Sequence, residues 1–226
     1  MHLRLSKIAS LLADPTRAVF LTKLMDPRPL TAGELALRAN VSPQVASAHV
    51  AKLVNGGLLQ LDRRGRNRYY ALSGPHVAEF LEALTRVCSF PEPSDAEGAQ
   101  QIAPLRFART CYDHLAGKLA VEVAERFVAT RLLNFAHDEF TLTARGEEFF
   151  STLGIDVPEV RMLRRAFARS CVDWSERRPH LAGALGAALL KRLESLKWIA
   201  RMRGTRAVRL TVAGRAAFSE RIGIRV

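Results

Sequence analysis

The sequence has few features of an exported, membrane-bound or disulfide-linked protein. It contains three cysteines in 226 residues, and a small odd number argues against a framework of structural disulfides. No apolar run reaches the roughly 20 residues that a membrane-spanning helix needs. The first residues mix basic and apolar side chains without the pattern of a removable signal peptide. We therefore expect a cytoplasmic protein without a membrane anchor.

Familiar catalytic motifs are also missing from the sequence. It has no Gly-rich phosphate loop followed by lysine, no Gly-x-Ser-x-Gly elbow and no His-Glu-x-x-His pair. Cysteine, histidine and aspartate do occur close together, so a cysteine-based enzyme is an alternative. They occur twice in similar surroundings, however, and a nucleophilic centre needs one asymmetric arrangement of nucleophile, base and orienting group. We expect no catalytic residues.

Acidic residues are too few to balance the basic ones. The chain has 34 Lys and Arg against 22 Asp and Glu, a formal net charge of +12, and a sequence pI of about 10.6. Such a charge attracts polyanions, including nucleic acid. Hydrophobic residues make up 48% of the chain, which is enough to fill the cores of one large or two ordinary domains.

The stretch Leu30–Leu72 has the pattern of a DNA-binding unit. Thr31 and Glu34 form a capping-box pattern that predicts a helix from about residue 32. Ser42 caps a second predicted helix, and Pro43 occupies its first turn, where a missing N–H costs nothing. Val45, Ala46, Val50, Leu53 and Val54 form its predicted apolar face. We expect the outward-facing polar side chains of this helix to enter a major groove.

A hairpin follows the second helix, and four arginines crowd its tip. Two runs of alternating apolar residues flank a turn around Gly65. Like charges so close together repel one another, so they are best placed beside a phosphate backbone or in a minor groove. We expect Gln44, Ser47 and His49 to read or approach bases. The full set of predicted DNA-binding residues is Ser42, Gln44, Ser47, His49, Lys52, Arg63, Arg64, Arg66, Asn67 and Arg68.

Several short segments together resemble one known family. They are Ala13-Asp14-Pro15-Thr16-Arg17, Val41-Ser42-Pro43, Ser47-Ala-His49-Val-Ala-Lys52-Leu53, Gly57-Leu58-Leu59 and Arg68-Tyr69-Tyr70-Ala71-Leu72. On these segments, the region from Leu5 to about Cys88 resembles the ArsR/SmtB family of winged helix-turn-helix repressors. The resemblance implies a homodimer that binds a palindromic operator in double-stranded DNA and leaves it when an effector arrives.

The chain departs from the family at its metal sites. Members that sense heavy metals through the first helix of the DNA-binding pair carry a cysteine pair there, whereas this chain has Glu34-Leu-Ala-Leu-Arg38. Zinc-type members place Asp, His and Glu on the helix after the wing, and here only His76 and Glu79 are present. We therefore look for the effector site elsewhere in the chain.

Two apolar stripes flank the DNA-binding pattern and favour a dimer. Both are too long to be buried within so small a domain, so a partner subunit is the simplest cover for them. The stripes are Leu3, Leu5, Ile8, Ala9, Leu11 and Leu12 before the pattern, and Val77, Phe80, Leu81 and Leu84 after it.

The pattern predicts two domains joined by a linker. Residues 1–88 form the winged helix-turn-helix and dimerisation domain, and the polar, proline-punctuated residues 89–104 form the linker. Residues 105–226 form a C-terminal sensor domain with an internal repeat, about 105–160 and 161–226. The repeat pairs Phe107-Ala-Arg-Thr-Cys111-x-Asp113 with Phe167-Ala-Arg-Ser-Cys171-x-Asp173, and His114-Leu-Ala-Gly117 with His180-Leu-Ala-Gly183.

We expect each copy to be a degenerate winged helix. Its predicted order is a helix, a second helix that starts at His-Leu-Ala-Gly, a strand or hairpin, and a closing helix. The fold class is then mainly α with small β-hairpin wings, with one winged helix-turn-helix domain and one domain of two winged-helix-like repeats.

The repeat places Cys111 and His114 opposite Cys171 and His180. Residues three apart share a helix face, and two thiolates with two imidazoles suit zinc or another thiophilic divalent metal ion. The six-residue insertion Trp174–Pro179 is expected to move the second histidine away from its cysteine. No other cofactor is indicated.

Other interpretations of the same residues stay open. Cys111 and Cys171 can form a reversible disulfide, or all of these residues can simply pack the repeat without a ligand. An organic effector pocket between the copies would use Tyr112, Asp113, Asp173 and Trp174. For the whole chain, a nonspecific or constitutive DNA-binding protein is the alternative to an effector-controlled repressor.

Overall fold

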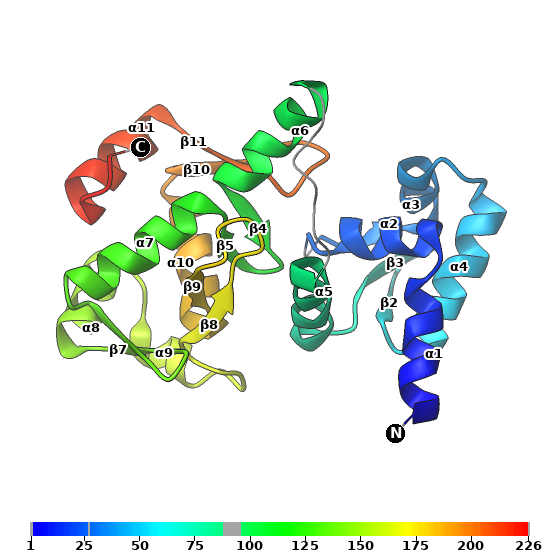
Figure 1. The fold of residues 1–226 in the computed structure, drawn as a ribbon, viewed down its shortest axis with the longest axis horizontal. Helices are drawn as coiled ribbons and strands as arrows, with labels where there is room; N and C mark the ends of the chain where they lie inside the picture. The colour runs from blue at the N-terminus through cyan, green and yellow to red at the C-terminus, as the bar shows by residue number, and fades with distance from the viewer. Residues whose placement is uncertain (1, 27, 88–95, 226) are drawn as a thin grey trace. The chain divides into compact units, whose positions relative to one another are not determined.

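The computed structural model describes residues 2–26, 28–87 and 96–225, and the chain divides into two compact units, Met1–Val87 and Cys88–Val226 (Figure 1). Each unit has its own hydrophobic core. About half of the chain is helical, and the strands form small antiparallel hairpins. The predicted mainly α fold class with small β-hairpins, and with a winged helix-turn-helix at the N-terminus, is confirmed; the winged-helix character of the C-terminal repeats stays a prediction.

In the N-terminal unit, the described residues form five helices and one three-stranded sheet of order β1-β3-β2. In the hairpin β2–β3, Leu59 pairs with Leu72 and Arg64 with Asn67, so the tip lies at Gly65–Arg66. The core contains Phe20, Leu35 and Leu53, each fully buried. The elements are α1 His2–Leu12, α2 Pro15–Leu24, β1 Leu30–Thr31, α3 Ala32–Ala39, α4 Pro43–Asn55, β2 Leu59–Arg64, β3 Asn67–Leu72 and α5 Pro75–Val87.

Local hydrogen bonds explain where the two central helices begin. The Thr31 hydroxyl accepts from the Glu34 backbone N–H at 3.2 Å, and the Thr31 N–H donates to the Glu34 carboxylate at 2.7 Å. This reciprocal pair is the predicted capping box. The Ser42 hydroxyl accepts from the Val45 N–H and caps α4, with Pro43 in the first turn. Both predicted helix starts are confirmed.

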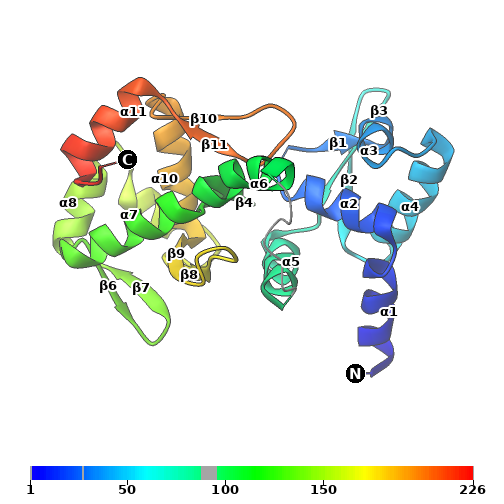
Figure 2. The same cartoon turned by 45° about the horizontal axis from the view of Figure 1, so that its top comes forward.

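The C-terminal unit contains the same order of elements twice after its first helix. A hairpin, a helix, a second hairpin and a closing helix follow one another in each half (Figure 2). The first half contains α6 Ala96–Phe107, β4 Arg109–Cys111, β5 His114–Ala116, α7 Lys118–Ala129, β6 Leu133–Ala136, β7 Glu139–Leu142, α8 Ala144–Thr152 and α9 Val157–Arg161. The second contains β8 Arg169–Val172, β9 Pro179–Ala182, α10 Gly183–Ser195, β10 Ile199–Arg201, β11 Val208–Leu210, α11 Val212–Ala217 and the π-helix η1 Phe218–Ile222.

The prediction of a helix that starts at His-Leu-Ala-Gly is wrong. In both copies these residues form the second strand of a hairpin, and the helix follows it. Tyr112, at the turn, has a φ of 58°, and Gly117 has a φ of 89°. A Cβ at Gly117 would lie 2.8 Å from the Arg106 carbonyl oxygen. A continuous helix cannot adopt these left-handed conformations, so the chain reverses direction instead.

The two halves of the C-terminal unit pack crosswise. Helix α7 of the first half packs on strand β9 of the second, and α10 packs on β5. The Arg126 side chain on α7 donates to the Ile222 carbonyl at 3.2 Å, and Arg192 on α10 donates to the Leu153 carbonyl. An arginine of each half therefore binds a backbone carbonyl at the end of the closing helix of the other half. A single hydrophobic core spans both halves.

The predicted linker is partly helical. Residues 96–104, which we assigned to the linker, belong to helix α6, and Pro104 lies inside this helix. Residues 89–95 lie outside the described residues. A proline inside a helix removes one backbone hydrogen bond. For that reason Pro104 favoured a linker over a helix when only the sequence was considered.

Close backbone packing at two glycines generates a stability prediction. A Cβ at Gly214 would collide with the Trp198 carbonyl oxygen, as one at Gly146 would with that of Leu132. Gly214→Ala should therefore lower the free energy of unfolding by about 1–3 kcal/mol, the usual cost of overpacking. Both tryptophans of the chain, Trp174 and Trp198, belong to the C-terminal unit. Tryptophan fluorescence during urea denaturation therefore reports on that unit.

Gly33→Ala is the matched control, followed by circular dichroism. Apart from its chain neighbours and the backbone of its own helix, nothing lies within 4 Å of the added Cβ, and alanine favours a helix over glycine by up to about 1 kcal/mol. An unchanged urea midpoint for Gly214→Ala would contradict the close approach.

Candidate nucleic-acid interface and a buried cysteine–histidine cluster

Helix α4 turns a polar, small-residue face to solvent. Gln44, Ser47 and Lys52 are exposed, while Ala46, Val50 and Leu53 anchor the opposite face in the core. Such a helix can approach base edges closely, because its exposed side chains are short or flexible. Ser42 is exposed as well, but its hydroxyl oxygen already caps the helix.

Two residues of α4 differ from their predicted positions. His49 does not face outward: its Nδ1 lies 3.5 Å from an Asp14 carboxylate oxygen and 3.4 Å from an Arg17 guanidinium nitrogen. Its ring packs edge-on against Phe20. Val45, predicted to be buried, is 42% exposed. Sequence periodicity therefore assigned both residues to the wrong faces of the helix. An exposed methyl group next to Gln44 can contact a thymine methyl.

The hairpin tip presents a concentration of positive charge. Arg63, Arg64, Arg66, Asn67 and Arg68 are all exposed, and Arg63 pairs directly with Arg68 across the strands. Like charges at paired positions destabilise a hairpin. A bound polyanion would reduce the repulsion between these two arginines. Arg64 is partly neutralised, because its Nε donates to Asp62 at 2.8 Å.

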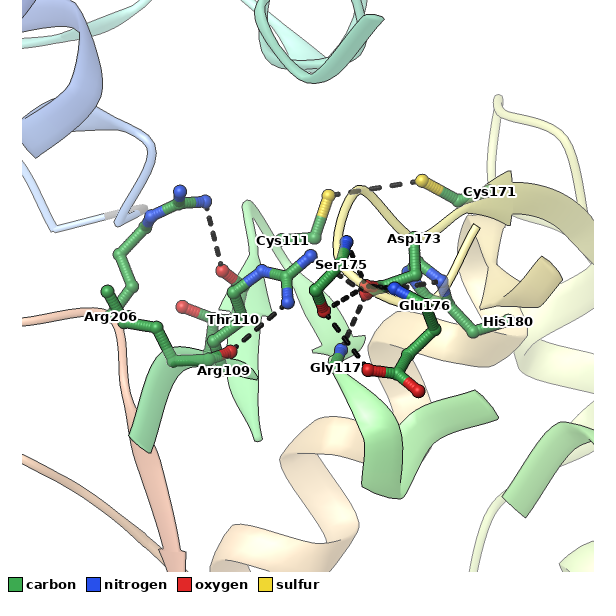
Figure 3. A network of polar contacts seen from close by, with 11 residues as sticks. Arg109, Thr110, Cys111, Gly117, Cys171, Asp173, Ser175, Glu176, His180 and Arg206 are labelled. Carbon is green, nitrogen blue, oxygen red and sulfur yellow. Dashed lines mark hydrogen bonds and ion pairs between the residues drawn. The ribbon is translucent and has the colours of Figure 1, made fainter. Parts of the chain in front are cut away.

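The C-terminal unit brings together the four predicted metal ligands. One donor atom from each of Cys111, His114, Cys171 and His180 lies within 4.8 Å of all the others, and all four residues are buried. The two sulfur atoms are 4.0 Å apart, and no disulfide joins them (Figure 3). The two imidazole rings stack with centroids 5.2 Å apart.

Hairpin register, and not a shared helix face, produces this cluster. Cys111 pairs with His114 across a two-residue turn, and Cys171 pairs with His180 across a longer one. The expectation that the insertion Trp174–Pro179 separates the second pair is wrong. The inserted residues mostly enlarge the turn, so the strand register survives.

Asp113 holds one side of the cluster. Its carboxylate lies 3.4 Å from His114 Nδ1 and forms an ion pair with Arg165. Burial raises the pKa of Asp113, but His114 and Arg165 outweigh it and lower the pKa to about 2. Burial lowers the pKa of His114, whereas Asp113 and Cys171 raise it to about 9. The pKa of Cys171 is lowered, first by the Cys111 thiol and then, against burial, by the two histidines.

Asp173 holds the other side through a dense set of hydrogen bonds. One carboxylate oxygen accepts from Arg109 and from the Gly117 N–H, each at 2.7 Å. The other accepts from the backbone and hydroxyl of Ser175 and from the Glu176 N–H (Figure 3). Burial raises the pKa of Asp173, but Arg109 and these donors lower it overall. Sequence analysis did not predict that Arg109 and Arg165 pair with these aspartates, although the repeated Phe-Ala-Arg motif contains Arg109.

The residues of the predicted effector pocket lie around this cluster. Asp173 is fully buried in its hydrogen-bond set, and Trp174 stacks against the Arg109 guanidinium, 4.6 Å from ring centroid to Cζ. Tyr112 and Asp113 are only partly buried. A separate apolar cavity of about 330 Å³ is lined by Ala124, Glu125, Val128, Ala129, Phe135, Phe140 and Pro179. The effector pocket stays a prediction.

The comparison with known proteins now decides the family. Residues 12–61 match the family described as "Helix-turn-helix domain". The HTH-type transcriptional regulator YdfF of Bacillus subtilis (strain 168) is 43% identical over 226 residues, which cover 100% of each chain. The chain belongs to the helix-turn-helix family of transcriptional regulators.

Solved structures also resemble this regulator over part of its length. HlyU from Vibrio cholerae N16961 is 27% identical and has a TM-score of 0.35, with 38% of this chain and 92% of HlyU covered. The cadmium metal-sensor CMTR from Mycobacterium tuberculosis is 30% identical and has a TM-score of 0.32, with 41% of this chain and 98% of CMTR covered. No helix in the described part of the regulator is long and apolar enough to cross a membrane.

The two parts of the DNA-binding surface should respond differently to substitution. Arg66→Ala should weaken binding to all duplexes and lower the salt slope by about 1, because we expect Arg66 to contact a phosphate. Gln44→Ala should instead relax the preference at one base pair by about 1–3 kcal/mol. Fluorescence anisotropy at several salt concentrations, on a selected site and a shuffled duplex, measures both effects.

Arg145→Ala is the charge-matched control, because it removes an exposed arginine from α8 of the C-terminal unit. It should leave the salt slope unchanged. Equal losses on selected and shuffled DNA for both Arg66→Ala and Gln44→Ala would contradict the division of roles.

Proposed function

We propose that this regulator is a cytoplasmic, homodimeric repressor that binds a palindromic operator and leaves it when the C-terminal unit binds an effector. The observation that carries the proposal is that α4 exposes a polar face and that the hairpin following it exposes an arginine-rich tip. The helix supplies base contacts, and the hairpin supplies phosphate contacts that fix its register on the duplex. The predicted DNA-binding residues, apart from His49, are exposed at α4 or on the hairpin, which supports this assignment.

Exposed apolar side chains support the homodimer. Leu5 on α1 is 66% exposed, Leu84 on α5 is 36% exposed, and Val87 at the end of α5 is 80% exposed. Leu5 and Leu84 belong to the two stripes that the sequence singled out. Isologous burial of α1 and α5 would cover them and pair two copies of α4. The two half-sites would then lie about one helical turn, roughly 10 bp, apart.

The C-terminal unit supports the sensing half of the proposal. It is the larger unit, and its core encloses two thiols, two imidazoles and the ion-paired carboxylate of Asp173. Replacement of buried ionic groups by well-packed apolar residues of the same volume is often neutral or stabilising, so stability alone gives little reason to keep them. Such a polar centre can bind an effector, and we infer that this binding changes the DNA affinity of the N-terminal unit.

In vitro selection from random duplexes tests the DNA-binding half of the proposal. The full chain is mixed with duplexes that carry a randomised central segment, and bound DNA is recovered and sequenced. We expect an enriched inverted repeat with half-sites about 10 bp apart, and a shuffled duplex bound at least about 10³-fold more weakly. Similar affinities for selected and shuffled DNA would establish nonspecific binding and overturn the proposal.

A further inference from the structure

We propose that Cys111, His114, Cys171 and His180 bind one thiophilic divalent cation per chain, with Zn²⁺ or Cd²⁺ as the reference ions. The site lies in the C-terminal unit, apart from the helices of the DNA-binding pattern. Its four ligands come from β4, β5, β8 and β9, so each half of the unit contributes one cysteine and one histidine. Two thiolates and two imidazoles are a known tetrahedral donor set for Zn²⁺.

The spacing of the sulfur atoms fits a tetrahedral ion. With Zn–S bonds of about 2.3 Å, two sulfurs at adjacent corners of a tetrahedron lie about 3.8 Å apart. The distance from Cys111 Sγ to Cys171 Sγ is 4.0 Å, about twice the length of a disulfide bond. All four donor atoms lie within 4.8 Å of one another, so a small contraction brings them into coordination distance.

Buried imidazole nitrogens provide an independent observation. Nε2 of His114 and both ring nitrogens of His180 have no hydrogen-bond partner among the described residues, although both side chains are at least 95% buried. A buried polar atom without a partner costs about 1–3 kcal/mol. A bound cation would satisfy Nε2 of His114 and one ring nitrogen of His180, and apolar packing alone gives no reason to retain these two imidazoles.

The carboxylates around the site favour one orientation of each ring. Asp113 faces Nδ1 of His114 at 3.4 Å, and Asp173 faces Nδ1 of His180 at 4.0 Å. A carboxylate on one ring nitrogen directs the other nitrogen to a metal and increases its basicity. Each aspartate is held by an arginine from the opposite half, Arg165 on Asp113 and Arg109 on Asp173. Asp113 and Asp173 are therefore positioning residues.

The buried, four-ligand arrangement indicates a closed site. A catalytic zinc site keeps one coordination position open for water, whereas four protein ligands fill a tetrahedron. A bound ion would link both hairpins and so couple the two halves of the unit. The expected effect of the ion on operator affinity rests on the proposed function, whereas the metal site itself does not depend on it.

Spectroscopy of the unmodified protein tests the site directly. The full chain, freed of metal by chelation and kept reduced with a phosphine, is titrated with Co²⁺ and, separately, with Cd²⁺. We expect one ion per chain, the visible bands of tetrahedral Co²⁺ with thiolate ligands, and their loss when Zn²⁺ is added. No stoichiometric binding, or an octahedral Co²⁺ spectrum without thiolate bands, overturns the proposal.

Variants assign the ligands. Cys171→Ser and His180→Ala should abolish the stoichiometric thiolate-bound Co²⁺ spectrum, while Cys88→Ser, the matched cysteine control, should retain it. Asp113→Asn should keep the spectrum but weaken Zn²⁺ binding 10–100-fold, the usual effect of a lost carboxylate partner. Circular dichroism checks that each variant is folded. Retention of full affinity by folded Cys171→Ser, or its loss in Cys88→Ser, would overturn the ligand assignment.

A second readout separates the metal site from the regulatory role. Operator binding is measured for the apo protein and after addition of one equivalent of Zn²⁺ or Cd²⁺, on the duplex obtained by selection. We expect operator affinity to fall at least about 5-fold, within the usual range of allosteric coupling, and Cys171→Ser to be insensitive. Stoichiometric metal binding with unchanged operator affinity would retain the site and overturn its role as effector. Failure to select DNA would overturn the proposed function alone.

Discussion

The buried ion pair between Arg109 and Asp173 is the interaction on which the C-terminal unit depends. The two side chains are 1% and 0% exposed and come from opposite halves of the unit. Removal of one partner from such a pair costs about 3–5 kcal/mol, since the other charge is left buried. Because Asp173 also accepts from Gly117 and from the turn after β8, it fixes both hairpins at once. The cysteine–histidine cluster exists only while that register holds.

The same exchange of contacts recurs at the far ends of the two halves. Arg126 and Arg192 occupy matching positions of α7 and α10. Each donates a hydrogen bond to a backbone carbonyl at the end of the closing helix of the other half. The second closing segment is one residue longer than the first between the matching glycines Gly146–Gly154 and Gly214–Gly223. A π-helical turn, Phe218–Ile222, contains the extra residue. Such turns absorb single insertions inside a helix, so the reciprocal contact is kept despite the insertion.

Local chemistry decided how much of the structure the sequence could predict. The capping box at Thr31, the cap at Ser42 and the turn at Gly65 depend on neighbouring residues alone, and all three are confirmed. His49 was misplaced because its partners, Asp14 and Arg17, are distant in sequence. His-Leu-Ala-Gly was misread as a helix start because its strand conformation depends on a partner strand and on the left-handed Gly117. Residue propensities contain neither of these tertiary constraints.

The cluster was nevertheless found through the wrong secondary structure, and charge balance explains why its composition is informative. In a medium of low dielectric constant, a net charge is costly unless it is compensated. A divalent cation with two thiolates is neutral. Without an ion, a Cys171 thiolate beside a His114 imidazolium is also neutral, in agreement with the lowered pKa of the one and the raised pKa of the other. Two cysteines and two histidines therefore give a neutral centre when a divalent ion is bound, whereas three or four thiolates around the same ion would leave a net negative charge.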